Sequence, residues 1–305
     1  MSGYAIGIDG GGTRTRGVLL GPDGEELGRA EGASAVADAL HPEAAAQAVE
    51  DVTRAAARAA GVALPLRALW AGLSGAGREA ARSAVEIELA RRGLADVTRV
   101  GTDVLAAFHD AFGDGPGVLL IAGTGSIAWG RSEDGREGRV GGWGRHIGDE
   151  GSGYAIGLEA LKRVARQADG RAPETALRAA ILSRLGLETI DDLVQWAGGA
   201  SRAEVAALVP LVAGVSAAGD AVAGEILVRA VEELEDHVLA ILENLGPWER
   251  PPGIALAGGL ITPGGPLRAP LERVLARHRL VPLGRTPDAA LGAARLGRTL
   301  GTFGT

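Results

Sequence analysis

The chain contains no cysteine, and Lys162 is its one lysine. Without cysteine there can be no disulfides, thiolate metal sites, iron–sulfur clusters or cysteine nucleophiles. A Walker A phosphate loop needs the pattern GxxxxGK[ST], which Lys162 does not complete, and no GxGxxG dinucleotide motif occurs either. A nucleotide bound by this protein must therefore be held by a different kind of loop.

Long apolar runs and blocks of positive charge are also missing. Hydrophobic residues make up 46% of the 305 residues, yet no run approaches the roughly 20 residues needed to span a membrane. The net charge of −7, with no basic block, argues against nucleic-acid or membrane partners. A strand is predicted by Tyr4, which leaves no room for a signal peptide, so we expect a cytoplasmic protein. The bias toward glycine, alanine and arginine fits either a GC-rich genome or heat adaptation, and the scarcity of lysine runs against the usual composition of hyperthermophile proteins.

The stretch from Tyr4 to Leu20, YAIGIDGGGTRTRGVLL, predicts two short strands joined by a glycine turn. Three consecutive glycines leave the bend without Cβ atoms, so a bulky anion can approach the backbone N–H groups. Asp9 ends the first strand beside this opening. Because a carboxylate repels phosphate unless a cation lies between them, the pair implies Mg²⁺. The alternative interpretation is a flexible hairpin tip with an incidental acid.

Residues 117–130, GVLLIAGTGSIAWG, repeat this arrangement of strand, glycine turn and returning strand. A further apolar strand over 254–260 also runs into paired glycines, and a helix to Arg277 follows a Pro/Gly turn. Two such hairpins about a hundred residues apart indicate a duplicated unit with two loops that face phosphate. The repetition favours nucleotide binding over a pair of incidental turns.

The rest of the chain alternates between predicted strands and helices, which is typical of an α/β protein. Further strands are expected over 28–31, 67–73 and 97–100, and helices over 42–60, from about 78 to 92, and from Asp288 onward. Residues 171–246 are expected to be helical, with a capping box at Ser201–Glu204. The tryptophans at 196 and 248 are interpreted as packing residues, and the acidic run of Glu232, Glu233, Glu235 and Asp236 as a solvated helix face.

Asp103 follows the strand over 97–100 and precedes the helix VLAAFHDAF. Local sequence favours a helix N-cap, since Asp is a preferred capping residue. A catalytic carboxylate at the carboxyl end of a strand is the alternative, and the two roles are compatible. Downstream, Asp149 and Glu150 lie just before a helix predicted from about Ser152 to Gln167, where they could cap it or face a ligand. His146 has no companion at metal-ligand spacing, so it is interpreted as structural or loop-exposed.

The order of these segments resembles the actin-like ATPase and sugar-kinase superfamily. IGIDGGGTRTRGVLL is similar to its first phosphate motif, IAGTGS to its second, and IALAGGLI to its adenosine motif. GGWGRHIGDEGSGYAIG, at 141–157, narrows the resemblance to the N-acetylglucosamine kinase branch, the BadF/BadG/BcrA ATPase family. The resemblance covers nearly the whole chain. It implies two RNase-H-like lobes with a central ligand cleft, over residues 1–113 completed by a helix at 288–305, and over 114–287 with a helical insertion.

The resemblance also implies roles for individual residues in a kinase that uses ATP and Mg²⁺. Asp103 would be the catalytic base that orients the 6-hydroxyl of the sugar, and Asp9 would hold Mg²⁺ through water. The expected phosphate and nucleotide contacts are Gly11, Gly12, Thr13, Gly123, Thr124, Gly258 and Gly259. The expected sugar contacts are Ser74, Gly75, Asp103, Ser126 and Asp149. Positioning and charge neutralisation dominate the catalysis of phosphoryl transfer, so this set of residues suits the reaction.

Two positions depart from the pattern of the animal N-acetylglucosamine kinases. Val36 and Ile127 stand where those enzymes carry polar sugar contacts, so N-acetylglucosamine, glucosamine, glucose and other amino sugars remain open as substrates. The alternatives are a broad-specificity kinase similar to hexokinase and glucokinase, a non-kinase ATPase of the BadF type, and a protein that binds without turnover. The absence of cysteine argues against the ATPases that hold an iron–sulfur cluster and against repressors of the related ROK group, which carry a cysteine-rich zinc motif. A homodimer is expected on resemblance alone.

Overall fold

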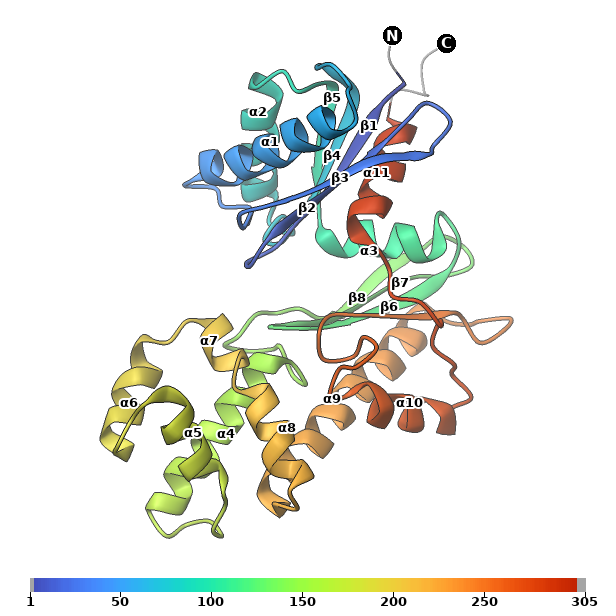
Figure 1. The fold of residues 1–305 in the computed structure, drawn as a ribbon. Helices are drawn as coiled ribbons and strands as arrows, with labels where there is room; N and C mark the ends of the chain where they lie inside the picture. The colour runs from blue at the N-terminus through green and yellow to red at the C-terminus, as the bar shows by residue number, and fades with distance from the viewer. Residues whose placement is uncertain (1–2, 301–305) are drawn as a thin grey trace. The chain divides into compact units, whose positions relative to one another are not determined.

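The computed structural model describes residues 3–300, which form two compact units. Within the described residues, unit 1 comprises 3–115 and 287–300, and unit 2 comprises Pro116–Thr286. Each unit contains one β-sheet with helices packed against it (Figure 1). No helix within residues 3–300 combines the length and the apolar character needed to cross a membrane.

Unit 1 is built on a five-stranded sheet in the order β3-β2-β1-β4-β5. Its strands are β1 (Ala5–Gly10), β2 (Thr15–Leu20), β3 (Glu26–Gly32), β4 (Leu66–Leu73) and β5 (Ala95–Gly101). Its helices are α1 (Pro42–Ala59), α2 (Glu79–Arg91), α3 (Asp103–Phe112) and α11 (Ala289–Thr299). The first three strands are antiparallel neighbours, whereas β1, β4 and β5 run parallel, so their carboxyl ends meet at one edge of the sheet.

Helices cover both faces of this sheet, with α1 and α2 on one face and α3 and α11 on the other (Figure 1). On the first face, α1 buries Val49, Val52 and Ala56 at helical spacing. On the second face, α11 lies so close to β1 that a Cβ atom on Gly7 would be 1.9 Å from the backbone nitrogen of Ala294. The absence of a side chain at Gly7 therefore allows this helix to pack directly on the central strand.

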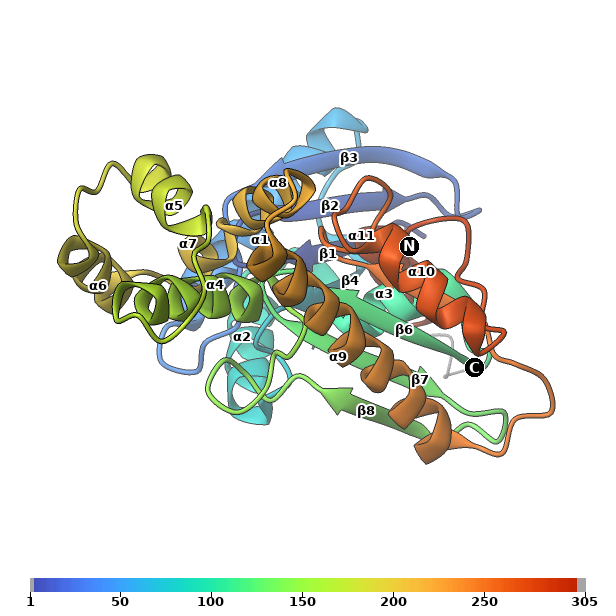
Figure 2. The same ribbon diagram turned by 90° about the horizontal axis from the view of Figure 1, so that it is seen from below.

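Unit 2 contains a four-stranded sheet in the order β8-β7-β6-β9. Its strands are β6 (Gly117–Ala122), β7 (Ser126–Arg131), β8 (Glu137–Gly141) and β9 (Ile254–Ala257). Its helices are α4 (Gly153–Ala168), α5 (Leu177–Leu185), α6 (Ile190–Gly199), α7 (Arg202–Ala206), α8 (Val209–Ala217), α9 (Ala221–Leu245) and α10 (Arg268–Arg277). The long helix α9 crosses β6, β7 and β8, as Figure 2 shows.

The core of unit 2 joins its sheet to its helices. Along α9, the stripe of Ile226, Val231, Leu234, Val238 and Ile241 is buried throughout. The tryptophans at 196 and 248 pack against the same core, which confirms their interpretation as packing residues. The capping box at Ser201–Glu204 is confirmed as well.

Several local predictions need correction. The helical character of residues 171–246 is confirmed, as five helices, whereas the strand β8 was not predicted. The acidic run on α9 is only partly a solvated face, because Glu235 pairs with His278 at 2.7 Å and Glu233 pairs with Arg229 at 3.3 Å. His146 is exposed in its loop, as expected.

Candidate functional site

The first glycine loop connects β1 to β2 as a tight hairpin. Gly10 pairs with Thr15, and the amide of Gly11 donates to the carbonyl of Arg14 at 3.1 Å, which closes the turn. The amides of Gly12 and Thr13 have no hydrogen-bond partner within residues 3–300, and both residues are exposed. A Cβ atom on Gly12 would meet nothing within 4 Å. The fold itself does not require glycine there, which is compatible with a ligand that approaches the backbone.

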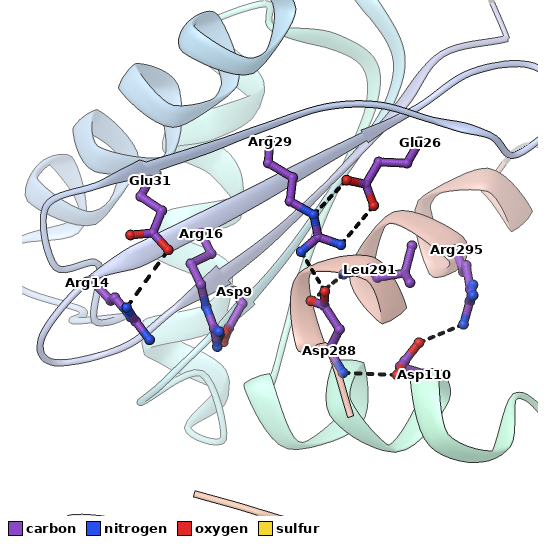
Figure 3. Close-up of polar contacts among 10 residues, drawn as sticks. All are labelled: Asp9, Arg14, Arg16, Glu26, Arg29, Glu31, Asp110, Asp288, Leu291 and Arg295. Carbon is purple, nitrogen blue, oxygen red and sulfur yellow. Dashed lines mark hydrogen bonds and ion pairs between the residues drawn. The ribbon is translucent and has the colours of Figure 1, made fainter. Parts of the chain in front are cut away.

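Asp9, the predicted Mg²⁺ residue, lies opposite Arg16 in this hairpin, and the guanidinium donates to its carboxylate at 2.6 Å (Figure 3). The Asp9 side chain is 15% exposed, so its charge is partly shielded from water by the surrounding protein. Arg16 was not among the residues predicted for the site. The hairpin register could have identified it, since a four-residue loop places positions 9 and 16 directly across from each other.

Asp103 is the first residue of α3, not its N-cap. Thr102 has the extended backbone of a cap, with ψ at 146°, and its hydroxyl accepts from the amide of Leu105. The predicted capping role of Asp103 is therefore wrong, because the adjacent threonine performs it. The Asp103 carboxylate instead accepts from the amide of Val104 at 2.9 Å.

The surroundings of Asp103 make its carboxyl group a weak acid. Burial, followed by the negative charge of Asp9, raises the pKa of Asp103 to about 6. The sheet register places Asp9 and Asp103 at the same end of the sheet. Asp9 pairs with Gly72 on β4, and Gly72 pairs with Gly101 at the end of β5, two residues before Asp103. Two acids near one sheet edge, one of them with a pKa near neutrality, are a recognised feature of functional sites.

The turn after β4 is connected to the first glycine loop through backbone hydrogen bonds. The amide of Ser74 donates to the carbonyl of Gly10 at 2.8 Å, and Val36 forms an isolated bridge with Ser74. A Cβ atom on Gly75, whose φ is 87°, would lie 2.6 Å from the carbonyl oxygen of Ala37. The first loop, the Ser74–Gly75 turn and the loop at Val36 therefore form one continuous surface of unit 1.

In unit 2, the second glycine loop is fastened to the start of α4. The amides of Gly153 and Tyr154 donate to the carbonyls of Gly123 and Thr124 at 2.8 and 3.2 Å. The buried hydroxyl of Ser126 donates to the carbonyl of Glu150 at 2.6 Å, so it anchors the loop before α4. These contacts hold the second loop rigidly against the helix.

The position of Asp149 before α4 had suggested that it could cap this helix. It does not, because the cap is Ser152, whose side chain accepts from the amide of Ala155. The carboxylate of Asp149 is buried and forms a short ion pair with Arg202, the first residue of α7. No sequence signal connects these two positions, which are 53 residues apart, so Arg202 was missed.

The turn after β9 completes this set in unit 2. Gly258 has a φ of 90°, and a Cβ atom there would lie 2.3 Å from the carbonyl oxygen of Ala122, the last residue of β6. The amide of Leu260 donates to that same carbonyl at 3.1 Å. A Cβ atom on Gly259 would meet nothing. The glycines after β9 therefore lie beside the strand that leads into the second loop.

The donor atoms present suit Mg²⁺ better than a transition metal. Within residues 3–300, no group of three or more His, Cys, Asp or Glu side chains is placed to hold a metal ion. Mg²⁺ is usually held through one or two carboxylates together with substrate phosphates and water, rather than by a cage of protein ligands. Asp9 beside an open glycine loop fits that requirement.

The two sheets and their glycine loops define a mixed α/β protein of the actin-like ATPase and sugar-kinase type, which confirms the predicted fold class. A solved structure of a candidate N-acetylglucosamine kinase from Chromobacterium violaceum is similar to this chain, with a TM-score of 0.80 and 32% identity over 96% of this chain and 98% of the other. A ROK family glucokinase from Streptomyces griseus, solved with glucose and AMPPNP, shares the fold at a TM-score of 0.58 and 18% identity, over 97% of this chain and 99% of the other.

The chain belongs to the BadF/BadG/BcrA/BcrD ATPase family, whose model matches residues 6–296. It is 33% identical over 261 residues to an N-acetylmuramic acid/N-acetylglucosamine kinase from Clostridium acetobutylicum, covering 85% of each chain. It is 30% identical over 307 residues to an N-acetyl-D-glucosamine kinase from Dictyostelium discoideum, covering 95% of this chain and 96% of the other. The family predicted from the sequence motifs is therefore confirmed.

Proposed function

We propose that this protein is an ATP-dependent kinase that phosphorylates the 6-hydroxyl of an amino sugar, with N-acetylglucosamine or glucosamine as the leading substrates. The relatives carry the names of such kinases, including a glucosamine kinase from Vibrio cholerae at 29% identity. The observation that carries the proposal is the carboxyl group of Asp103, partly buried beside Asp9, with a pKa of about 6. A general base works best when its pKa lies near the working pH.

In this proposal, the oxygen of the sugar 6-hydroxyl attacks the γ-phosphorus of ATP, Asp103 accepts the hydroxyl proton, and ADP leaves. The first loop, at Gly11, Gly12 and Thr13, binds the β- and γ-phosphates, as preorganised N–H groups do in other phosphoryl-transfer sites. The amides of Gly12 and Thr13 are the donors, since that of Gly11 already donates to the carbonyl of Arg14. Asp9 holds Mg²⁺ through water, and when bound the ion neutralises phosphate charge. Arg16 must then share or release the carboxylate of Asp9, which it contacts at 2.6 Å.

In unit 2, we assign Gly123 and Thr124 to the γ-phosphate and Gly258 and Gly259 to the nucleoside. Support comes from the open space at Gly123 and Gly259, where a Cβ atom would meet nothing within 4 Å. The backbone hydrogen bonds that fasten the second loop to α4 keep its amides in fixed positions before ATP arrives. Such preorganisation lowers the cost of ordering the loop around a ligand.

The proposed sugar contacts are Ser74, Gly75 and Asp103 in unit 1, with Ser126 and Asp149 in unit 2. Ser126 already donates its hydroxyl proton to the carbonyl of Glu150, so it could only accept a further hydrogen bond from a sugar. Neither Val36 nor Ile127 can hydrogen-bond an N-acetyl group through its side chain. Specificity for that group must therefore come from other residues.

We also propose that the protein is a cytoplasmic homodimer.

The proposal is tested with a coupled assay for ADP release over N-acetylglucosamine, glucosamine, N-acetylmuramic acid and glucose. We expect sugar-dependent ADP release by the wild-type protein, a 6-phosphate identified by NMR, and loss of turnover in Asp103→Asn. Faster ADP release with glucose than with the amino sugars would favour a broad-specificity kinase similar to hexokinase. ATP hydrolysis that no sugar accelerates would contradict the kinase proposal, and equal turnover by Asp103→Asn would remove the residue from the role of base.

A further inference from the structure

Arg202 lies beside a predicted sugar contact, Asp149, and belongs to none of the motifs. It belongs to α7, one of the short helices between α4 and α9, and its guanidinium donates through Nη2 to Oδ2 of Asp149. The Asp149 side chain is 5% exposed, whereas that of Arg202 is 40% exposed. The carboxylate is thus withdrawn from water, and its cation faces partly outward.

The backbone around Asp149 is adapted to this arrangement. Asp149 has a φ of 63°, a left-handed conformation that is uncommon outside glycine. Its carbonyl accepts from the amide of Ser152, the cap of α4, at 3.1 Å, which fixes the residue against the helix. Strained residues held by their surroundings concentrate at ligand sites. The strain therefore suggests that the orientation of this carboxylate has a use.

The second glycine loop makes room for the same ion pair. A Cβ atom on Gly125 would lie 2.9 Å from Oδ1 of Asp149 and 3.0 Å from Nη2 of Arg202. The φ of Gly125 is not positive, so its backbone does not by itself demand glycine. The missing side chain allows the ion pair to lie directly against the loop that carries Gly123 and Thr124.

Contacts other than the ion pair also hold α7 in place. The capping box of Ser201 and Glu204 satisfies the first turn of α7, and Val205 is buried in the core of unit 2. The helix also packs tightly on α4, since a Cβ atom on Gly157 would lie 2.1 Å from the carbonyl of Val205. A buried ion pair is in any case weak support for stability, because desolvation offsets the attraction.

The guanidinium of Arg202 does not have a hydrogen-bond partner for each of its donors. Its Nε atom is buried and has no hydrogen-bond partner within the described chain. The contact with Asp149 is therefore made although it leaves a buried donor unsatisfied.

We propose that Arg202 is a positioning residue for the sugar: by holding Oδ2 of Asp149 it orients the carboxylate so that the other oxygen, Oδ1, can accept from a hydroxyl group of the substrate. This inference rests on the proposed function, and it makes the helical segment α5–α8 a contributor to substrate recognition. Asp149 contacts the sugar, and Arg202 acts through Asp149. Its loss weakens sugar binding and leaves ATP binding intact.

The test compares Arg202→Met, Arg202→Lys and Asp149→Asn with Arg178→Met, a control at an exposed arginine on α5. Sugar binding is measured by calorimetry with N-acetylglucosamine and with glucosamine, and KM is measured separately for sugar and for ATP. We expect Arg202→Met to raise Kd and KM for sugar roughly 10- to 100-fold, the usual effect of removing a residue that orients a ligand. Arg202→Lys restores part of this loss, and Arg178→Met behaves as wild type.

A double variant separates action through Asp149 from direct contact with the substrate. When Arg202 acts through Asp149, the variant that carries both Arg202→Met and Asp149→Asn binds sugar no more weakly than Asp149→Asn alone. Unchanged sugar binding by Arg202→Met, or a rise confined to KM for ATP, would overturn the positioning role while the kinase assignment stands. Absence of sugar binding by the wild-type protein would overturn both proposals together.

Discussion

Replacing Asp103 with asparagine should stabilise the folded protein at neutral pH while it abolishes turnover. Asn keeps the shape of the side chain and an oxygen that can accept from the amide of Val104, as the carboxylate does at 2.9 Å. It removes the charge that burial and Asp9 oppose. A residue whose ionisation costs folding energy is expected where function, rather than stability, determines the side chain.

The magnitude follows from the pKa. The folded-state pKa of Asp103 is raised from 3.8 to about 6, a difference of about 2. At about 1.4 kcal/mol for each pKa unit, ionised Asp103 costs the folded state up to about 3 kcal/mol. Below pH 3.8 the carboxyl is protonated in both states and there is no cost, between pH 3.8 and 6 the cost grows, and above pH 6 it is complete. The stability advantage of Asp103→Asn should therefore be near zero at pH 4 and largest at pH 8.

The measurement is the free energy of unfolding in urea at pH 4.5, 6 and 8. Hydrogen–deuterium exchange of peptides from β1, β4 and α3 reports unit 1 separately, since the two units need not unfold together. Asp23→Asn, in the exposed turn between β2 and β3, is the matched control and should show no such growth in stability with pH. ADP release should fall roughly 100-fold or more in Asp103→Asn.

Two results would refute this reasoning. If Asp103→Asn is no more stable than the wild-type protein at pH 8, ionised Asp103 carries no folding cost and its surroundings are not those of a general base. If the advantage is the same at pH 4.5 and pH 8, it comes from packing or hydrogen bonding rather than from the charge.

Three further predictions follow from the packing and the ion pairs. Gly292→Ala should lower Tm by several degrees, because its Cβ would lie 2.0 Å from the carbonyl of Ala106 and overpacking costs roughly 1–3 kcal/mol; an unchanged Tm would show that α3 and α11 can separate freely. Gly12→Ala, whose Cβ meets nothing in the fold, should leave Tm unchanged and raise KM for ATP, and an unaltered KM would contradict the phosphate role of the first loop. Asp110→Ala should destabilise unit 1 by roughly 1.5–3 kcal/mol, because its buried carboxylate accepts from Arg295 at 2.6 Å and from the amide of Asp288 at 2.9 Å; a loss below 1 kcal/mol in urea unfolding would show that water replaces the contacts.

Local patterns predicted the glycine loops and the elements around them because those signals are short in range. The hairpin at Asp9, the strand over 66–73 and the helix that begins after Asp288 each carry their own start and stop signals. The Asp288 side chain caps α11 by accepting from the amide of Leu291, as its position suggested. Such signals need no knowledge of the rest of the molecule.

The missed features depend on contacts between distant segments. Arg202 meets Asp149 only because α7 packs on α4, and Asp110 meets Arg295 only because α3 packs on α11 (Figure 3). The cap at Thr102 was missed for a different reason, since Thr and Asp are adjacent and either can cap a helix. The backbone dihedral angles determine which of the two residues caps the helix, and the local sequence does not predict those angles.

The packing of α11 on β1 has a consequence for the order in which the protein matures during synthesis. The strand β1 is made before the whole of unit 2, whereas the helix α11 that packs on it follows only with residues 289–299. Unit 2 is encoded in one uninterrupted stretch between the two segments of unit 1, so it can fold before unit 1 is complete. Until α11 is made, α3 covers its own part of that sheet face, and the part of β1 that α11 covers stays open to solvent.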